Sequence, residues 1–254
     1  MPATLPKTPR DGTHLLQCEL MYKRVLLKLS GEQLAGKYEF GVDPEIAAYL
    51  AEEIKKALAT GCQLVLVVGG GNMVRGAEIA GHGIRRVTGD QMGMLSGLIN
   101  SMALTDIFEA HGLPTRCLSN VYAEQIAESY SYRLAEKHLQ NGRVVIVAGG
   151  SGRSYVTHDT AAVMFALELD CEVVLKATKV DGVYDKDPNK FDDAQLIPRM
   201  SFQDAVENQA VAVMDKAALG LALEQHKPLI VFNPTVEGNI TRVVSGDAIG
   251  TSIN

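Results

Sequence analysis

The chain has 254 residues, of which 46% are hydrophobic and 21% charged. This balance is typical of a globular protein that buries a large core. The net charge is −6 at pH 7, so the chain as a whole has no basic surface suited to nucleic acid. An anionic ligand must therefore be held by a few local cations and backbone amides.

The first twenty residues are rich in Pro and Thr and carry Lys7 and Arg10 without a following apolar stretch. A secretory signal needs such a stretch of about 7–15 residues, so we expect a disordered N-terminal tail over residues 1–20 instead. Met21 stands directly before the first predicted strand and is an alternative start. We expect one catalytic domain over residues 21–254, because no repeat, linker or change of composition marks a boundary.

No segment of the sequence predicts a membrane span. The most apolar later stretch, residues 91–105, has 15 uncharged residues, whereas a helix needs about 20 to cross a bilayer. The four cysteines are Cys18, Cys62, Cys117 and Cys171, and their wide spacing matches no metal or disulfide pattern. They predict reduced thiols in a cytoplasmic protein.

Short apolar runs alternate along the chain with segments of helical periodicity. The predicted strands are residues 25–29, 64–68, 144–148, 172–176 and 229–232, and the predicted helices are residues 44–59, 90–110, 124–139, 160–169 and 215–225. Nearly continuous apolar strands between amphipathic helices are typical of a parallel sheet covered on both faces. The sequence therefore predicts an α/β fold, a three-layer α/β/α sandwich with a mostly parallel central sheet.

Polar and glycine-rich sequences follow four of these strands. In open α/β sheets, ligands bind at the carboxyl ends of the strands, so these sequences are the place to look for a site. They are Lys28 to Glu32, Gly69 to Asn72, Gly149 to Arg153, and Lys176 to Gly182.

Gly69, Gly70 and Gly71 let the backbone approach a ligand closely and direct N–H groups at phosphate oxygens. Arg75 can add a two-pronged contact to the same phosphates. The alternative is a tight turn beside a solvated arginine. Lys28 lies inside an apolar run, where a cation needs an opposite charge, and it is either a lysine at the strand end that reaches solvent or a phosphate ligand.

Asp159 stands before the predicted helix 160–169 and has two interpretations, a helix cap or a functional acid. Asp181, Asp185 and Asp187 follow the strand that ends at Lys176, where surface acids are common. Together with the lysines and glycine loops, these acids are candidate partners for Mg²⁺ and for the lysines.

The four loops, in this order, resemble the amino-acid kinase superfamily and, within it, the bacterial UMP kinases. The resemblance covers the chain from about Tyr22 to its end. It implies the amino-acid kinase fold, the reaction ATP + UMP → ADP + UDP, Mg²⁺ bound with ATP, and a homohexamer built from dimers through the helix 90–110. Its most specific pieces are Lys28 to Glu32, Gly69 to Gly76, Gly89 to Met94, and Lys176 to Tyr184 with Asp187-Pro188.

The resemblance also implies roles for individual residues. The implied catalytic residues are Lys28, Asp159 and Arg75. The implied ATP-binding residues are Lys28, Leu29, Ser30, Gly31, Gly71, Arg75, Thr178, Tyr184 and Asp187. The implied UMP-binding residues are Gly70, Asp90, Ser151, Gly152, Arg153, Ser154, Tyr155, Val156, Thr157 and His158. Asp159 would orient the lysines, and no side chain is assigned to the metal itself.

One loop departs from the pattern of the family. Arg153 replaces the usual Asn, Ser154 the usual Pro, and His158 the usual Thr near the acceptor phosphate. If His158 replaces that Thr as a phosphate ligand, we expect an imidazolium there and a UMP affinity, relative to His158→Thr, that weakens from about pH 6 to 8.5. The alternative is that its side chain points away and only its backbone amide serves the site. Gln91 and Thr105 stand where many relatives carry basic residues linked to activation by GTP, which argues against that control here.

Two other functions stay open. One is another small-acceptor kinase of the superfamily, and the other is a non-catalytic nucleotide-binding or storage protein. Retention of Lys28, Asp159 and Asp187 argues against the second.

Overall fold

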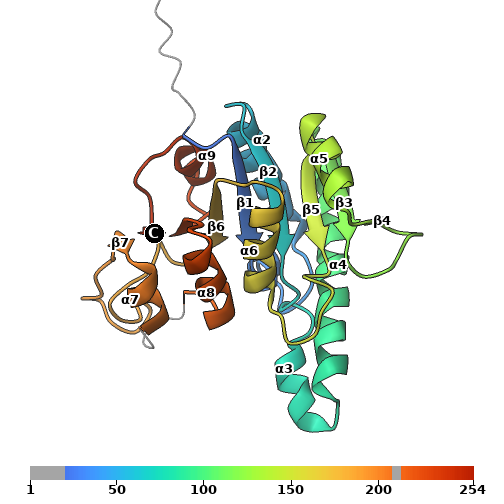
Figure 1. The fold of residues 1–254 in the computed structure, drawn as a ribbon, viewed down its shortest axis with the longest axis horizontal. Helices are drawn as coiled ribbons and strands as arrows, with labels where there is room; N and C mark the ends of the chain where they lie inside the picture. Colours follow the sequence, from blue (N-terminus) through green and yellow to red (C-terminus); the bar gives the residue numbers. More distant parts are fainter. Residues whose placement is uncertain (1–20, 208–212) are drawn as a thin grey trace, which may run out of the picture.

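One nine-stranded sheet organises the protein (Figure 1). This computed structural model describes residues 21–207 and 213–254, so the predicted tail over residues 1–20 lies outside the described residues. The strand order is β4-β3-β5-β2-β1-β6-β8-β9-β7, and every neighbouring pair is parallel except β8 and β9. The strands are β1 Arg24–Leu29, β2 Gln63–Val68, β3 Thr115–Ser119, β4 Glu128–Ser129, β5 Val144–Ala148, β6 Val173–Ala177, β7 Arg199–Met200, β8 Leu229–Phe232 and β9 Thr251–Ile253.

Helices cover both faces of this sheet, as the alternating pattern predicted. They are α1 Gly31–Leu34, α2 Pro44–Leu58, α3 Gly76–Ile79, α4 Arg86–Ala110, α5 Tyr132–Gln140, α6 His158–Glu168, α7 Phe202–Glu207, α8 Lys216–Glu224 and α9 Asn239–Val244, with a 3₁₀ turn at Ala80–His82. The three-layer α/β/α fold with a mostly parallel sheet is thereby confirmed. No helix in the described ranges combines the length and apolar character that a bilayer span requires.

Alternate residues of each strand enter two separate cores. Leu26 of β1 packs with Ala162 and Phe165 of α6 in one core, whereas Leu27 packs with Leu50 of α2 and Ile240 in the other. In Figure 1, α6 and α8 lie in front of the sheet. Successive side chains of a strand point to opposite faces of the sheet. The position of a residue along its strand therefore decides which layer of helices its side chain packs against.

The cysteines in the described ranges, Cys62, Cys117 and Cys171, are buried free thiols. Burial raises the pKa of each of these thiols to about 12, so they stay protonated and unreactive at neutral pH. Their predicted reduced state agrees with this arrangement.

Candidate active site

Two lysines and one aspartate form a charged cluster at the carboxyl ends of the two central strands. Lys28 of β1 and Lys176 of β6 are direct neighbours in the parallel register. Along its strand, each lysine lies on the same side as the residues that pack in one core with α6. Both side chains therefore point from the sheet toward α6. Asp159 of α6 receives them, with its Oδ1 2.8 Å from Lys28 Nζ and its Oδ2 2.8 Å from Lys176 Nζ.

The start of α6 decides the role of Asp159. Thr157 is the N-cap, and its hydroxyl oxygen accepts hydrogen bonds from the Asp159 and Thr160 amides at 3.1 and 3.2 Å. The helix therefore begins at His158, earlier than the predicted residue 160, and Asp159 sits in its first turn. The interpretation of Asp159 as a helix cap is wrong, because Thr157 is the N-cap. The Asp159 carboxylate is therefore free to pair with the lysines.

The cluster is shielded from solvent, with the side chains of Lys28, Lys176 and Asp159 only 11%, 14% and 15% exposed. Burial alone would raise the pKa of Asp159, but the two ammonium groups outweigh it and hold that pKa below its usual range. Burial, together with the charge of Lys28, lowers the pKa of Lys176 despite the nearby carboxylate. One carboxylate thus balances two cations, which leaves a net positive charge for an anionic ligand.

The glycine loops after β1 and β2 press directly against each other. A Cβ on Gly31 would lie 2.6 Å from the Gly69 carbonyl oxygen and 2.9 Å from the Gly71 nitrogen. A Cβ on Gly70 would lie 2.6 Å from the Gly93 carbonyl oxygen of α4. Only glycine, which has no Cβ, allows the backbones to come this close. These close contacts bring together the start of α1, the loop after β2, and α4 beside Lys28.

A pocket of about 170 Å³ opens between this loop, α4 and the start of α6. Of the predicted UMP-binding residues, Gly70, Asp90, Val156, Thr157 and His158 line it, together with the predicted ATP residue Gly71. Its further lining residues are Val74, Gly76, Arg86, Gly93, Met94 and Gly150. The structure therefore joins residues that are far apart in sequence into one cavity next to the lysines.

Asp90 closes one side of this pocket. Its carboxylate accepts a hydrogen bond from the Tyr155 amide at 2.8 Å and another from Arg86 Nε at 2.8 Å. The Arg86 guanidinium lies 5.3 Å from the centre of the Tyr155 ring, and Tyr155 has a left-handed backbone with φ of 66°. These contacts hold the loop after β5 over α4.

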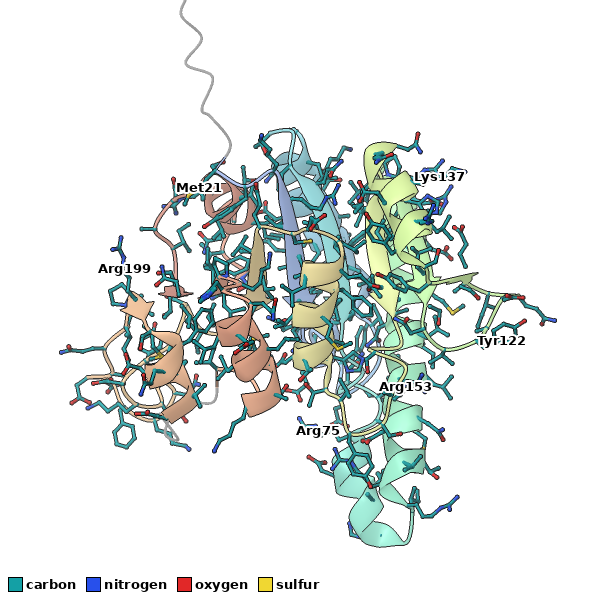
Figure 2. All side chains as sticks on the ribbon, in the orientation of Figure 1. Met21, Arg75, Tyr122, Lys137, Arg153 and Arg199 are labelled. Carbon is teal, nitrogen blue, oxygen red and sulfur yellow. The ribbon has the colours of Figure 1, made fainter. Side chains whose placement is uncertain are left out.

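The remaining residues of that loop do not line the pocket. Gly152 donates its amide to the Gly149 carbonyl, and the Ser154 hydroxyl donates to the Val87 carbonyl. Ser151 accepts from the Arg153 amide at 3.3 Å. Figure 2 shows Arg153 and Arg75 at the same edge of the sheet, above α3, where each can meet an incoming anion.

Arg75 is half exposed and forms ion pairs with Glu32 and with Glu78, the latter at 3.1 Å. It therefore stands beside the glycine loop with its charge balanced by two carboxylates. A bound phosphate must compete with Glu32 and Glu78 for this guanidinium.

The other predicted ATP residues do not line the pocket. Leu29 is fully buried in the α2 core and can offer only its backbone, and the Ser30 amide donates a hydrogen bond to the side-chain oxygen of Gln33 at 2.9 Å. The Thr178 hydroxyl donates to the Val180 carbonyl at 2.6 Å. Tyr184 bridges to Leu196, and Asp187 accepts from the Asn189 amide at 3.0 Å, so both belong to the loop that follows β6.

His158 departs most from its expected chemistry. Its Nε2 is shielded from solvent and has no hydrogen-bond partner among the described residues, and it lies 3.1 Å from the position a Cβ would take on Gly97. Burial, together with the charge of Lys28, lowers the pKa of His158 to about 4. A pKa this low makes the imidazole neutral at pH 6 and above, which argues against the expected imidazolium; its charge beside a bound phosphate stays a prediction.

This neutral ring predicts a weak pH effect. The ratio of UMP affinity in the natural protein to that in His158→Thr should change by less than about twofold between pH 6 and 8.5, because neither side chain titrates there. Both proteins see the same ionisation of UMP, which cancels in the ratio. Calorimetric titration at several pH values measures it, and a ratio that falls steadily with pH would show that bound phosphate charges the ring.

Sequence reasoning left Lys176 and six lining residues of the pocket without a site role; the six are Val74, Gly76, Arg86, Gly93, Met94 and Gly150. Lys176 was visible in the motif after β6, and its place as a cation in an apolar run is the same signal that singled out Lys28. Gly93 and Met94 lie in the motif Gly89 to Met94, which the resemblance had singled out. Arg86 offered no such signal, because its role depends on where α4 passes the glycine loop.

The fold and the site define an α/β protein with glycine loops and a lysine–aspartate–lysine cluster at the carboxyl edge of its sheet, an arrangement suited to an anionic ligand. Comparison with known proteins agrees. A family model described as Amino acid kinase family matches residues 23–233. A uridylate kinase of Dichelobacter nodosus is 44% identical over 233 residues, covering 92% of this chain and 96% of that protein.

Two solved structures share the architecture. The UMP kinase of Bacillus anthracis superposes with a TM-score of 0.86 at 36% identity, covering 92% of this chain and 96% of that one. The UMP kinase of Ureaplasma parvum gives 0.84 at 30% identity, covering 91% and 98%. The chain therefore belongs to the amino acid kinase family and, within it, to the uridylate kinases.

Proposed function

We propose that this protein transfers the γ-phosphoryl group of ATP to the 5′-phosphate of UMP, giving ADP and UDP. The observation that carries the proposal is the Lys28–Asp159–Lys176 cluster beside a pocket lined by Gly70, Asp90 and His158. Family membership at 44% identity to a uridylate kinase supports the same reaction.

The reaction requires the two nucleotides to be positioned and their negative charge to be neutralised, and it does not require a general base. An oxygen of the UMP phosphate is already anionic near neutral pH, so it attacks the γ-phosphorus without a general base, and ADP leaves as the P–O bond to the β-phosphate breaks. Repulsion between two polyanions forms much of the barrier. Lys28, Lys176 and Arg75 would counter that repulsion, while the amides of Gly70 and Gly71 hold oxygens in line.

The acceptor would enter the pocket between α4 and the start of α6. Its phosphate would lie near Gly70 and His158, and Asp90 would accept hydrogen bonds from the ribose hydroxyls after releasing Tyr155 or Arg86. Residues 151–156 would cover the uracil. ATP would place its phosphates over Ser30, Gly31 and Gly71, with its remaining part toward Thr178, Tyr184 and Asp187.

Mg²⁺ fits this scheme as a companion of ATP. Within residues 21–207 and 213–254, no group of three or more His, Cys, Asp or Glu side chains is arranged to hold a metal ion. Phosphate oxygens and water must therefore supply most ligands, as is usual for Mg²⁺ at nucleotide sites. When bound, the ion neutralises charge on the β- and γ-phosphates.

A coupled assay of ADP release tests the reaction. UMP, CMP, dCMP, aspartate, glutamate and acetylglutamate are offered separately with ATP and Mg²⁺, and we expect turnover with UMP to exceed the others by orders of magnitude. Preference for another acceptor would indicate a different small-acceptor kinase. Arg153, Ser154 and His158, which depart from the family pattern, are the residues that could change the acceptor. Absence of turnover with all six would indicate a nucleotide-binding or storage protein.

We further propose that residues 21–254 form one catalytic domain, that the protein is cytoplasmic, and that it assembles as a homohexamer of dimers. The buried free thiols support a reducing compartment. An exposed apolar stripe on α4 supports the dimer, since single exposed apolar residues are common but aligned ones mark contacts. It consists of Val87, Leu95, Ile99 and Met102, which are 43%, 48%, 51% and 36% exposed.

The assembly predicts a change of mass on substitution. Leu95→Lys combined with Ile99→Lys should shift the solution mass from a hexamer to a smaller species, because two charges per chain would be buried at the contact. Light scattering after size-exclusion chromatography measures this. Leu223→Lys on α8, a residue 43% exposed, is the matched control and should leave the mass unchanged. An unchanged mass in the α4 variant would contradict the dimer contact.

A further inference from the structure

Asn72 and Asn100 form a closed pair of amide side chains behind the glycine loop. Asn72 follows Gly71, and Asn100 lies in the middle of α4; they are 6% and 0% exposed. Asn100 Nδ2 donates to Asn72 Oδ1 at 2.8 Å, and Asn72 Nδ2 donates to Asn100 Oδ1 at 2.9 Å. This reciprocal pair ties the loop after β2 to α4 in a buried position.

The second N–H of each amide binds a backbone carbonyl. Asn100 Nδ2 donates to the Gly69 carbonyl at 2.8 Å, and Asn72 Nδ2 donates to the Gly41 carbonyl at 2.6 Å. Both amide groups therefore have all their donors in use. A fully satisfied buried network of this kind is rigid, and loss of one member leaves the others unpaired.

The contact with Gly69 sets the direction of the next N–H. In a trans peptide unit the C=O and N–H groups are coplanar and point in opposite directions. Holding the Gly69 oxygen toward α4 therefore turns the Gly70 N–H the other way. Neither Gly70 nor Gly71 donates its amide to another described residue, and both line the pocket beside Lys28.

Gly71 is oriented by different means. The Gly70 carbonyl accepts hydrogen bonds from the Met73 and Val74 amides at 3.0 and 3.1 Å, so the local turn fixes the peptide that carries the Gly71 N–H. The side chain of Asn100 thus directly binds the peptide that carries the Gly70 N–H, while the local turn fixes the peptide that carries the Gly71 N–H. The two amides can be perturbed separately.

We infer that Asn100 is a positioning residue for the acceptor phosphate: it aims the Gly70 N–H into the pocket by holding the Gly69 carbonyl, with Asn72 locking its amide plane. The inference rests on the proposed function, in which Gly70 binds the phosphate of UMP and Gly71 lies beside those of ATP. It assigns a role in acceptor binding to a residue that touches no substrate.

The test compares Asn100→Ala with Ser101→Ala. Ser101 is its neighbour on α4, is fully buried, and donates its hydroxyl to the Gly97 carbonyl within the helix, so its loss leaves the loop alone. We expect Asn100→Ala to raise the KM for UMP by about tenfold or more, the scale of one hydrogen bond to a charged group. The KM for ATP should stay within about twofold, and Ser101→Ala should change neither.

A purely structural role would lower the melting temperature of both variants and leave the two KM values of the folded enzyme unchanged, which would overturn the inference. An equal rise in both KM values would overturn it as well. Wild-type turnover of UMP is measured in the same series. Failure of that turnover would reject the proposed function, whereas normal wild-type turnover with an unaffected variant rejects only the role of Asn100.

Asn100→Asp serves if the alanine variant does not fold, because it keeps the volume of the side chain. It is assayed at pH 8.5, where an ionised carboxylate can accept hydrogen bonds but cannot donate to the Gly69 carbonyl. The same selective rise in the KM for UMP is expected. A wild-type KM for UMP in this variant would overturn the inference.

Discussion

Lys28→Ala is expected to lower kcat by on the order of 10²-fold or more, with a much smaller change in the KM for UMP. The ammonium group should act mainly on charge that grows during transfer. Lys28 is 11% exposed and 2.8 Å from Asp159, so its charge acts in a partly desolvated site where it is stronger than in water. Steady-state kinetics with UMP and ATP varied separately measures the effect.

Two further variants separate charge from packing. Lys28→Met keeps most of the side-chain volume and should lose as much turnover as the alanine variant. Lys37→Ala removes an exposed lysine that pairs with Glu45 at the surface and should leave kcat unchanged. Wild-type turnover in Lys28→Met would remove the ammonium from the mechanism.

The central sheet was predictable because its strands are buried on both faces. Residues 25–29, 64–68, 144–148, 172–176 and 229–232 all fall on observed strands within a residue or so of their ends, since helices cover both sides and the runs are almost wholly apolar. β3 was missed because its sequence includes Thr115, Arg116 and Ser119. The short β7 and β9 offer too few residues for any periodicity.

Helix boundaries were less predictable where a polar residue starts the helix. The predicted helix 124–139 begins only at Tyr132, because residues 128–129 pair with β3 as an edge strand. α4 begins at Arg86, ahead of the predicted residue 90. That earlier start places Arg86 one turn before Asp90 and creates their ion pair at 2.8 Å.

The site divides along the same line. Lys28 and Gly70 could be found because a cation or a run of glycines at the end of a buried strand is unusual. Asp90 and His158 were found only through the resemblance to the family. Lys176, Arg86 and Asn100 needed three-dimensional information: strand register for the first, and the path of α4 past the glycine loop for the other two. The neutral state of His158 depends on burial and on a neighbouring charge, neither of which a sequence displays.

Asp159→Asn is expected to reduce both stability and turnover, because it leaves Lys28 and Lys176 on neighbouring strands without a counter-charge. Breaking a buried ion pair typically costs about 3–5 kcal/mol, and the 15% exposure of Asp159 places the cluster near that regime. We expect kcat to fall by about tenfold to hundredfold as the lysines separate. Urea unfolding followed by fluorescence or circular dichroism, together with steady-state kinetics, measures the two effects.

The pH dependence of that stability loss follows from the shifted pKa values. The folded protein holds the pKa of Asp159 below its unfolded value, so the carboxylate stabilises the fold above the unfolded pKa of about 3.9, and this contribution is lost as pH falls through the lower folded pKa. The pKa of Lys176 is lowered on folding, so the variant should recover stability as pH rises and that lysine loses its proton. The difference between wild type and Asp159→Asn should therefore be greatest near neutral pH and shrink toward both extremes.

A double variant separates charge balance from catalysis. Adding Lys176→Met to Asp159→Asn removes one of the two uncompensated cations, so it should restore much of the stability while turnover stays low. The control Asp247→Asn removes an exposed carboxylate that pairs with Arg242 and should change stability by less than about 1 kcal/mol. If Asp159→Asn were as stable as wild type at pH 7, or if its stability loss were the same at every pH, the carboxylate would not be what holds the two lysines together. The positive charge beside the pocket would then have to be stabilised by groups other than Asp159.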